Sequence, residues 1–349
     1  MKKCLSSILA LALTFSLVGC SGGSGSTPSA SGSASGDSSD PKVSMNVSVP
    51  DADNSYIYAA AQEFKSRVEE YSNGSIELTI YPNGSLYGDG NAAISSVGNG
   101  SLDIVILASS LYASFDPSFY VVSVPYLFDD TKQLQDYLNS DIGKDLFNSV
   151  ESMGITCLGS WTRSFRQVTN SKKPINSPAD LESMVLRTPS NSLYVEFFTA
   201  CGANATPMSF SEVYNALQLN TLDGQENPVD VPATNNFYEV QKYISATNHI
   251  ADAWIVGMNT NKLNGLTENQ QNALHQAAEE CQQWYVDYQA EKDGEMLKLL
   301  TDNGMEYNEV PEEGFQEFVS VSQELYPKFE EMVQNDELFD ATVAFCGKA

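Results

Sequence analysis

The sequence predicts an α/β protein of two lobes, preceded by an export signal and a polar tether. Three observations lead to this prediction: the length of 349 residues, strands and helices that alternate in two successive runs, and an N-terminal segment of different composition. A chain of this length exceeds what one compact core usually holds. Its hydrophobic content of 42% is ample for globular cores, so the chain as a whole is not disordered.

The first twenty residues have the pattern of an export signal. Two lysines precede an apolar stretch from Leu5 to Val18, which is too short for a membrane span and about as long as the apolar core of a signal peptide. The sequence Leu-Val-Gly before Cys20 resembles the lipobox of bacterial lipoproteins. We therefore predict a signal peptide over residues 1–19 and lipidation of Cys20. A plain signal peptide with an accidental cysteine is the alternative.

Residues 20–41 are predicted to be the lipidated cysteine and a flexible linker. From Ser21 to Pro41 the chain consists almost entirely of Ser, Gly, Ala, Pro, Thr and Asp and offers no core-forming residue. Such a tether holds a folded domain off a membrane, so we expect an extracytoplasmic protein, lipid-anchored to the bacterial cell membrane at the cell surface or in the periplasm. No later stretch reaches 18 apolar residues, and we expect no membrane channel in the mature chain.

The net charge of -27, from 45 acidic and 18 basic residues, argues against two classes of partner. Nucleic acids and anionic membrane surfaces both require clustered Lys and Arg, so we expect no nucleic-acid partner. The overall charge does not decide the sign of a small ligand. At physiological salt the field is screened within about 8 Å, and a local arginine can still bind an anion.

The first run of elements predicts a parallel sheet with helices on its faces. Strands alternate with helices up to residue 159, and βαβ units of this kind place parallel strands in one sheet. The expected strands are Val43–Val49, Ser75–Tyr81, Asp103–Ala108 and Ile155–Gly159, and the expected helices are Ser55–Tyr71, Asn91–Val97, Lys132–Asn139 and Ile142–Met153.

The second run begins near Phe165 and leads into helices. Thr267 to Leu300 is predicted to be one long helix, with Thr267 as its cap and Gln270 at the third position of a capping box. The other expected strands lie near Arg166–Thr169, Val185–Arg187, Tyr243–Ala246 and Trp254–Met258, and the other expected helices near Leu193–Ala200, Phe210–Leu219, Phe315–Leu325 and Leu338–Phe345.

No motif for catalysis is found in the sequence, so we predict that the protein is not an enzyme. It has no G-x-S-x-G, H-E-x-x-H or Walker sequence. Gly88-Asp89-Gly90 mimics part of a dinucleotide fingerprint but follows a loop instead of a strand end. The residues from Asp51 begin like a calcium loop, but Tyr56 and Gln62 stand where glycine and glutamate are required.

The cysteines and histidines are too scattered for a metal or thiol-redox site. Four cysteines remain once Cys4 leaves with the signal and Cys20 carries lipid, and none is part of a C-x-x-C pair. Zinc and redox chemistry need clustered ligands, so we predict no metal and no cofactor. We expect buried, unpaired thiols, although spacing does not decide disulfide pairing. The residues concerned are Cys157, Cys201, Cys281, Cys346, His249 and His275.

Several motif blocks follow one another between Arg166 and Gln241. The blocks are Arg166–Asn170, Pro174–Leu181, Leu186–Pro189, Pro207–Tyr214, Ala216–Gln218, Asp223–Pro228 and Phe237–Lys242. In this order they closely resemble the substrate-binding proteins of TRAP transporters, the DctP-like family of extracytoplasmic solute receptors. The resemblance is strongest over these blocks and extends more loosely from Val43 through the long helix.

The resemblance implies a periplasmic-binding-protein-like fold: two α/β lobes, an interlobe cleft that closes on the ligand, and a long helix spanning both lobes. We expect lobe I to comprise residues 42–163 and about 252–285, and lobe II residues 164–251 and about 286–349. The resemblance also implies a monomeric solute-binding protein of a TRAP transporter. Such a protein captures a small organic acid and delivers it to TRAP-type membrane permease subunits for uptake.

By the family's motifs, four residues of this chain are expected to bind the ligand. Arg187 matches the arginine whose forked donors bind the ligand carboxylate, and Asn227 matches the asparagine that assists it. Arg166 matches an arginine close to the ligand, and Phe210 matches an aromatic that packs against it. Guanidinium chemistry supports Arg187 independently, because it offers two parallel N–H donors at carboxylate spacing. The alternatives are a structural role for Arg187, an ion pair for Arg166, a turn at Asn227 and core packing for Phe210.

The identity of the acid stays open, as do two other functions. Sialic-acid-binding members carry an acid and an arginine after the strand that ends at Ala108, whereas this chain has Ser-Ser-Leu, which argues against sialic acid. C4-dicarboxylates, sugar acids and keto acids remain. The other functions are a ligand-sensing receptor that partners a membrane sensor, and an extracytoplasmic enzyme on the same fold. The enzyme would need a nucleophile–base pair or metal ligands.

Overall fold

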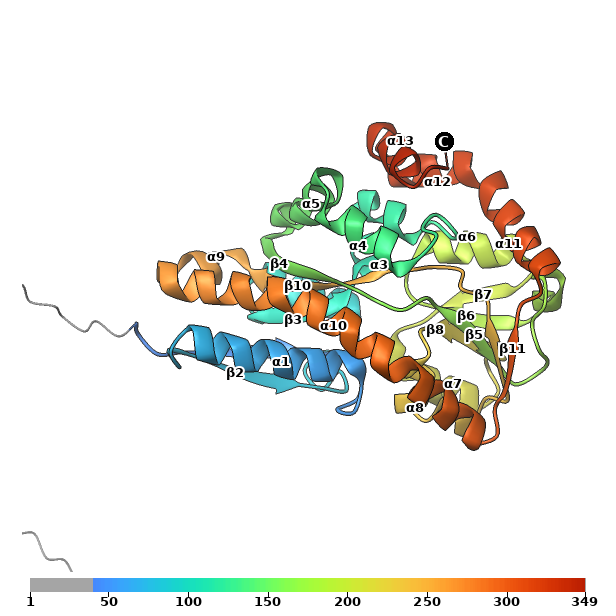
Figure 1. Cartoon of the computed structure of the whole chain (residues 1–349), viewed down its shortest axis with the longest axis horizontal. Coiled ribbons are helices and arrows are strands. Elements are labelled where there is room, and N and C mark those ends of the chain that lie inside the picture. The colour runs from blue at the N-terminus through green and yellow to red at the C-terminus, as the bar shows by residue number, and fades with distance from the viewer. Residues whose placement is uncertain (1–39, 349) are drawn as a thin grey trace, which may run out of the picture. The chain divides into compact units, whose positions relative to one another are not determined.

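Two β-sheets organise residues 40–348, the part of the chain that the computed structural model describes (Figure 1). The predicted signal peptide, Cys20 and the tether up to residue 39 lie outside the described residues. Each sheet, with the helices around it, forms one lobe, and we call them the first and the second lobe in chain order. The predicted two-lobed α/β fold is confirmed.

The first sheet has five strands in the order β2-β1-β3-β10-β4. β1 is parallel to β2 and β3, as predicted, but β10 pairs antiparallel with both β3 and β4 and separates them. All seven residues of β10 are buried, so this strand takes a central position with both edges paired. The prediction of a parallel sheet was wrong at this position. The strands are β1 (Val43–Ser48), β2 (Ile76–Tyr81), β3 (Ile104–Ala108), β4 (Ile155–Thr162) and β10 (Ala253–Asn259).

Helices cover the first sheet largely where the sequence predicts them. The expected helix over 142–153 is divided into α5 and a 3-10 turn, η2. The elements are α1 (Tyr56–Tyr71), α2 (Gly90–Gly98), α3 (Ser109–Tyr112), η1 (Pro117–Ser123), α4 (Thr131–Asn139), α5 (Asp141–Asn148), η2 (Ser149–Met153) and α9 (Thr260–Asn264).

The second sheet has six strands in the order β11-β9-β5-β8-β6-β7. Three of them, β7, β8 and β11, are four residues long and were not expected from the sequence, because they lack the apolar alternation of a longer strand. The strands are β5 (Gln167–Asn170), β6 (Val185–Thr188), β7 (Asn204–Pro207), β8 (Gly224–Asn227), β9 (Tyr243–Ala246) and β11 (Glu306–Glu309), and the helices are η3 (Pro178–Leu181), α6 (Ser192–Ala200), α7 (Phe210–Gln218), α8 (Asp230–Thr234) and η4 (Phe237–Glu239).

The chain crosses between the lobes through two paired segments and one long helix. The segment from β4 to β5 and the segment from β9 to β10 are joined by backbone bonds, Arg163 N to Asp252 O and Arg166 N to Ile250 O, each 2.9 Å. Helix α10 (Glu268–Asp302) runs past both lobes, contacting α1 and β4 in the first and α8 in the second (Figure 1). Its predicted capping box, Thr267 with Gln270, is present.

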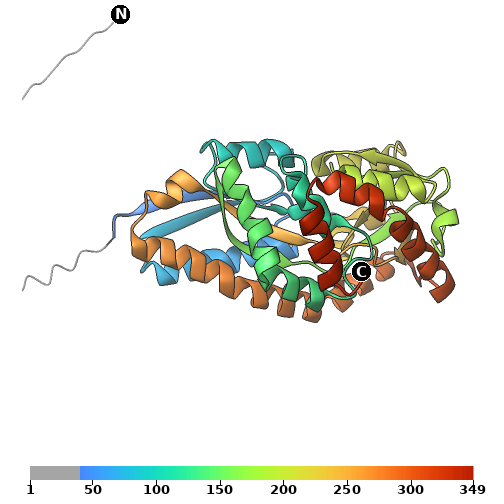
Figure 2. The same cartoon turned by 90° about the horizontal axis from the view of Figure 1, so that it is seen from above.

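The three C-terminal helices pack on different lobes. α11 (Glu312–Glu324) contacts η3 and α6 of the second lobe, whereas α12 (Tyr326–Val333) and α13 (Asp336–Phe345) contact η1 of the first, and α13 lies beside α5 (Figure 2). Phe329 and Phe339 join the apolar cluster that contains Phe119 of η1. The expectation placed all residues from 286 in lobe II, and the packing of these last two helices differs from it because their apolar faces are buried against the first lobe.

The four cysteines at positions 157, 201, 281 and 346 are free, and all but Cys157 are buried. Burial raises the pKa of Cys157, Cys201 and Cys281 to about 12, which keeps these thiols protonated and inert. The expectation of mostly buried, unpaired thiols is therefore confirmed. Of the helices between residues 40 and 348, none has the length and apolarity that a membrane crossing requires.

Candidate functional site

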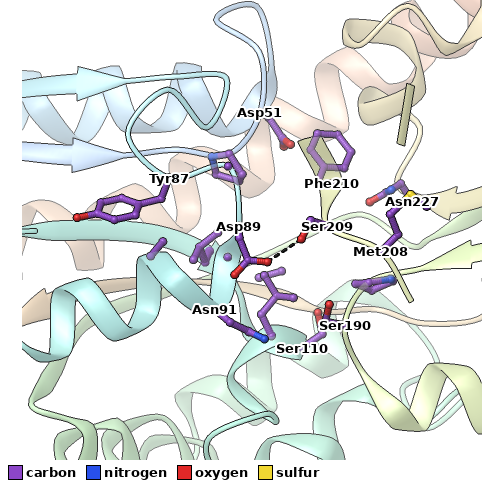
Figure 3. Close-up of a pocket in the computed structure, with 18 of the residues that line it drawn as sticks. Asp51, Tyr87, Asp89, Asn91, Ser110, Ser190, Met208, Ser209, Phe210 and Asn227 are labelled. Atoms are coloured by element: carbon purple, nitrogen blue, oxygen red, sulfur yellow. Dashed lines mark hydrogen bonds between the residues drawn. The ribbon is translucent and has the colours of Figure 1, made fainter. Parts of the chain in front are cut away.

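A pocket of about 80 Å³ lies between the two lobes (Figure 3). At roughly 10–15 Å³ for one water, this volume corresponds to about five to eight waters, which is space for a small metabolite. Its first-lobe wall comes from the segments that follow β1, β2 and β3, and its second-lobe wall from β6, β8 and the start of α7. Ligand sites in α/β proteins commonly lie at such carboxyl ends of strands.

All four residues that the sequence analysis selected, Arg166, Arg187, Phe210 and Asn227, line this pocket. The sheet brings them together, because β5, β8 and β6 are neighbours: Arg187 stands beside Gln225, and Gln167 stands opposite Asn227.

Prolines help to place two of these residues at strand ends. Pro189 follows Arg187 and Thr188, and Pro228 directly follows Asn227. Proline has no N–H to donate, so the ladders of β6 and β8 stop there and the chain turns away. Arg187 and Asn227 are thereby left at the carboxyl ends of two neighbouring strands, at the pocket.

Arg187 is a buried cation, and three of its five N–H donors have no partner among residues 40–348. Its Nε and Nη2 donate to the carbonyl oxygen of Met208 at 3.0 and 2.6 Å, and its guanidinium lies 5.9 Å from the Phe210 ring. Within residues 40–348 no carboxylate pairs with it, and Nη1 donates to no protein acceptor. Burial lowers the pKa of Arg187 to about 10; the charges of Glu226 and Asp51 oppose this shift, and that of Arg166 adds to it. The side chain is 3% exposed, and buried charges are normally paired, so this site calls for an anion.

The guanidinium of Arg166, by contrast, donates its hydrogen bonds to other residues of the protein. Its Nε and Nη2 form a forked ion pair with Glu226, Nη2 also donates to Asn227 Oδ1 at 3.0 Å, and Nη1 donates to Asp252 Oδ2 at 3.3 Å. Burial opposes its charge, but Glu226 raises the pKa of Arg166 above its ordinary value. We therefore assign Arg166 to the interlobe ion network and expect it to reach a ligand mainly through its electric field and through Asn227.

That network lies on the two crossing segments. Asp252 also accepts from Arg163 at 3.2 Å, and Arg163 stacks 4.1 Å from the Trp254 ring. His249 Nε2 lies 3.0 Å from Glu226, and burial lowers the pKa of His249, so the neutral ring donates to the carboxylate. Burial alone would raise the pKa of Glu226, but Arg166 and His249 lower it to about 2.

Asn227 has one donor left for a ligand. Its Oδ1 accepts from Arg166, and its Nδ2 donates to Gln225 Oε1 at 2.6 Å. An amide nitrogen carries two hydrogens, so one N–H remains. Asn227 faces the pocket from the same wall as Met208 and Phe210 (Figure 3). Phe210 lines the pocket and also packs against the apolar cluster that contains Val213 and Phe237. Part of its ring therefore belongs to the core, which was the alternative to ligand contact.

The first-lobe wall holds polar groups that the sequence analysis missed. Asp51 Oδ2, Asn91 Oδ1 and Ser110 Oγ are buried and have no hydrogen-bond partner within the described part of the chain (Figure 3). Each residue follows the carboxyl end of one of three neighbouring parallel strands, β1, β2 and β3. That placement was the available signal, but the sequence analysis considered Asp51 only as a false calcium loop.

The lobes touch at the pocket mouth. Asp89, the cap of α2, accepts from Ser209 Oγ at 2.6 Å (Figure 3). Ser211 Oγ donates to Gly88 O at 2.9 Å. The stretch that mimics a dinucleotide fingerprint thus lines the pocket and bonds to the second lobe. Within residues 40–348 no cluster of three His, Cys, Asp or Glu is arranged to hold a metal ion.

Comparisons with known proteins agree with this architecture. The model of the DctP family, bacterial extracellular solute-binding protein family 7, matches residues 47–332. The 2,3-diketo-L-gulonate-binding periplasmic protein YiaO of Escherichia coli is 34% identical over 249 residues, covering 71% of this chain and 76% of YiaO.

Two solved structures are similar over almost their whole length. The sugar acid binding protein DctPAm of Advenella mimigardefordensis, in complex with galactonate, has a TM-score of 0.85 at 27% identity and covers 88% of this chain and 99% of its own. A TRAP periplasmic solute-binding protein of Shewanella oneidensis with bound succinate has a TM-score of 0.82 at 27% identity and covers 87% of this chain and 99% of its own.

Proposed function

We propose, from the premise that this chain belongs to the family 7 bacterial extracellular solute-binding proteins of TRAP transporters, that it captures a small organic carboxylate and delivers it to membrane permease subunits. The observation that carries this proposal is Arg187, a buried guanidinium that lines the interlobe pocket and has no acidic partner in residues 40–348. The free end of the guanidinium offers Nη1 and the second N–H of Nη2, which match the two oxygens of a carboxylate.

The lining of the pocket favours capture over chemical conversion. Its polar groups belong to arginines, asparagines, serines, Asp51, Asp89, Tyr87 and Trp254, and no histidine or cysteine is among the lining residues. A hydrolytic site would need a nucleophile in contact with an effective base, or a metal ligand set. Ser209 does contact a carboxylate in the pocket, but its hydrogen bond lowers the pKa of Asp89, which makes Asp89 a weak base. The proposal therefore includes a ligand that is held and released unchanged. It also includes a monomeric receptor, as the family resemblance implies.

A screen of small organic acids by thermal unfolding tests this function. An acid at 100 times its dissociation constant is expected to raise the free energy of unfolding by about 2.7 kcal/mol, which is a readily measured shift in midpoint. The bound acid, recovered and analysed by mass spectrometry, is expected to be unaltered. No shift with any carboxylate, or recovery of a converted product, would contradict the proposal.

Attachment through Cys20 is the second part of the proposal. It is supported by the lipobox-like sequence and by the Ser/Gly-rich tether that follows. Cys20→Ser is expected to release the protein from the membrane fraction or leave it unprocessed, because serine lacks the thiol that receives the lipid. Cys4→Ser is the matched control, since Cys4 is removed with the signal peptide. Unchanged membrane attachment and mass in the Cys20 variant would refute the anchor.

A further inference from the structure

Asp51 is a buried carboxylate that the protein does not satisfy. The side chain is 3% exposed and lies at the pocket after β1, and Oδ2 has no partner in the described residues. No basic side chain forms an ion pair with it there, although burying a lone carboxylate is costly. Burial accordingly raises the pKa of Asp51 to about 6, even though Arg163, Arg166 and Arg187 act in the opposite direction. At the pocket wall, the Asp51 carboxylate is thus free to accept a hydrogen bond from a ligand.

Two further acceptors lie on the same wall. Ser110 Oγ and Asn91 Oδ1 are also buried and without partners in the part of the chain that the structure describes. Together with Asp51 they line the pocket from the first lobe, whereas Asn227 lines it from the second (Figure 3). Arg187, on β6, also lines it from the second lobe. The pocket therefore has a cationic wall that suits a carboxylate and, on the other lobe, a wall of oxygen acceptors that suits O–H donors.

The charges around the pocket can be compensated by one anionic group of a ligand. Arg163 and Arg166 are matched by Asp252 and Glu226 through the ion pairs described above. Arg187 is the pocket arginine without such a partner among residues 40–348. One ligand carboxylate compensates it, but a second carboxylate on the ligand would meet Asp51 instead of a cation. Two carboxylates that share one site disfavour each other's charge.

From this arrangement we infer that the pocket selects an acid with one carboxylate and several hydroxyl groups, such as a sugar acid, and rejects a simple dicarboxylate. Arg187 and Asn227 hold the carboxylate, and Asp51, with Ser110 and Asn91, accepts hydrogen bonds from the hydroxyl groups. Asp51 is the residue that determines specificity. This inference rests on the proposed function and names the ligand class of the same site.

An ammonium group on the ligand is the competing explanation for Asp51, because a carboxylate also pairs with a cation. Of the positive charges that act on Asp51, that of Arg187 has no ion-pair partner among residues 40–348, so the field there is unfavourable to a further cation. A neutral hydroxyl donates to the carboxylate without that penalty, in a charge-assisted hydrogen bond.

Calorimetric titration with matched acids tests the inference. D-erythronate and succinate share a four-carbon chain, and D-galactonate and adipate share a six-carbon chain; each pair sets a hydroxylated monocarboxylate against a plain dicarboxylate. In at least one pair, the wild-type protein is expected to bind the hydroxylated acid at least about tenfold more tightly. Asp51→Asn is expected to weaken that binding about ten- to a hundredfold, as for loss of a charged hydrogen bond, and to leave or improve binding of the dicarboxylate.

Asp53→Asn is the matched control, because Asp53 is exposed two residues away and is expected to leave every affinity unchanged. A preference for the dicarboxylate in both pairs, or the same change for both acids in Asp51→Asn, would overturn the inference. So would tight binding of L-threonine, which would assign Asp51 to an ammonium group, or failure of all four acids while another carboxylate binds. If no carboxylate in the wider screen binds, the proposed function itself fails.

Discussion

Arg187→Ala is expected to weaken binding of the captured acid by roughly thirty- to several-thousand-fold, the largest effect of any single substitution in the pocket. Truncating one partner of a buried, hydrogen-bonded charge pair costs about 2–5 kcal/mol, and each 1.4 kcal/mol is a factor of ten. Here the ligand carboxylate would be stranded in a pocket where, among the described residues, the other two lining arginines, Arg163 and Arg166, already pair with Asp252 and Glu226.

Arg187→Lys separates geometry from charge. Lysine keeps the positive charge, but its single nitrogen cannot both donate to Met208 O, as Nε and Nη2 do, and present a fork to the ligand. We therefore expect this variant to bind poorly as well. Arg67→Lys is the control, because Arg67 pairs with Glu63 and Glu280 and is not among the residues that line the pocket.

Titration calorimetry on folded variants measures these affinities, with matched circular dichroism as the folding check. If Arg187→Lys bound the acid as tightly as the wild type, the bidentate contact would be disproved and the carboxylate subsite would have to lie elsewhere in the pocket.

Glu226→Gln is expected to lower the free energy of unfolding by about 3–5 kcal/mol, because it leaves the Arg166 charge buried without its main partner. Glu226 is fully buried, accepts the forked bond of Arg166 and is contacted by His249. Chemical denaturation measures the change, and Glu182→Gln, at an exposed position, is the control. A midpoint for Glu226→Gln equal to that of the control would show that the network is not stabilising.

Glu226 is also expected to make the free energy of unfolding depend on pH in the acidic range. Its pKa is lowered in the folded protein, from an ordinary value of 4.5 to about 2. A lowered pKa means that the unfolded chain binds the proton first, so the stabilisation is complete above pH about 4.5 and is lost as the pH falls towards 2. Wild-type stability is expected to fall over this window more steeply than that of Glu226→Gln, which has no such group to protonate.

Local patterns predicted most of the elements. The apolar spacing of residues 56–71 and the capping box at Thr267 each predicted a helix, and both helices are present. Helix formation could be predicted there because it depends on residues within one or two turns. The position of β10 could not be predicted in this way. Its apolar run indicates a buried strand, but which two strands it separates depends on partners about 100–150 residues earlier in the chain.

The pocket, too, could be predicted from the sequence only in part. The sequence by itself identified the two α/β lobes, and its motif blocks identified Arg187, Asn227, Arg166 and Phe210, all of which line the pocket. Only the tertiary structure decided which donors and charges remain available: Arg166 forms ion pairs with Glu226 and Asp252, whereas Arg187 forms none with any residue from 40 to 348. It also decided that Asp51, distant from those motifs, faces the same pocket without a partner in that range. The physical reason is that a side chain's free donors and the effective strength of its charge depend on burial and on neighbours from other strands. Neither quantity is encoded in the local pattern of residues.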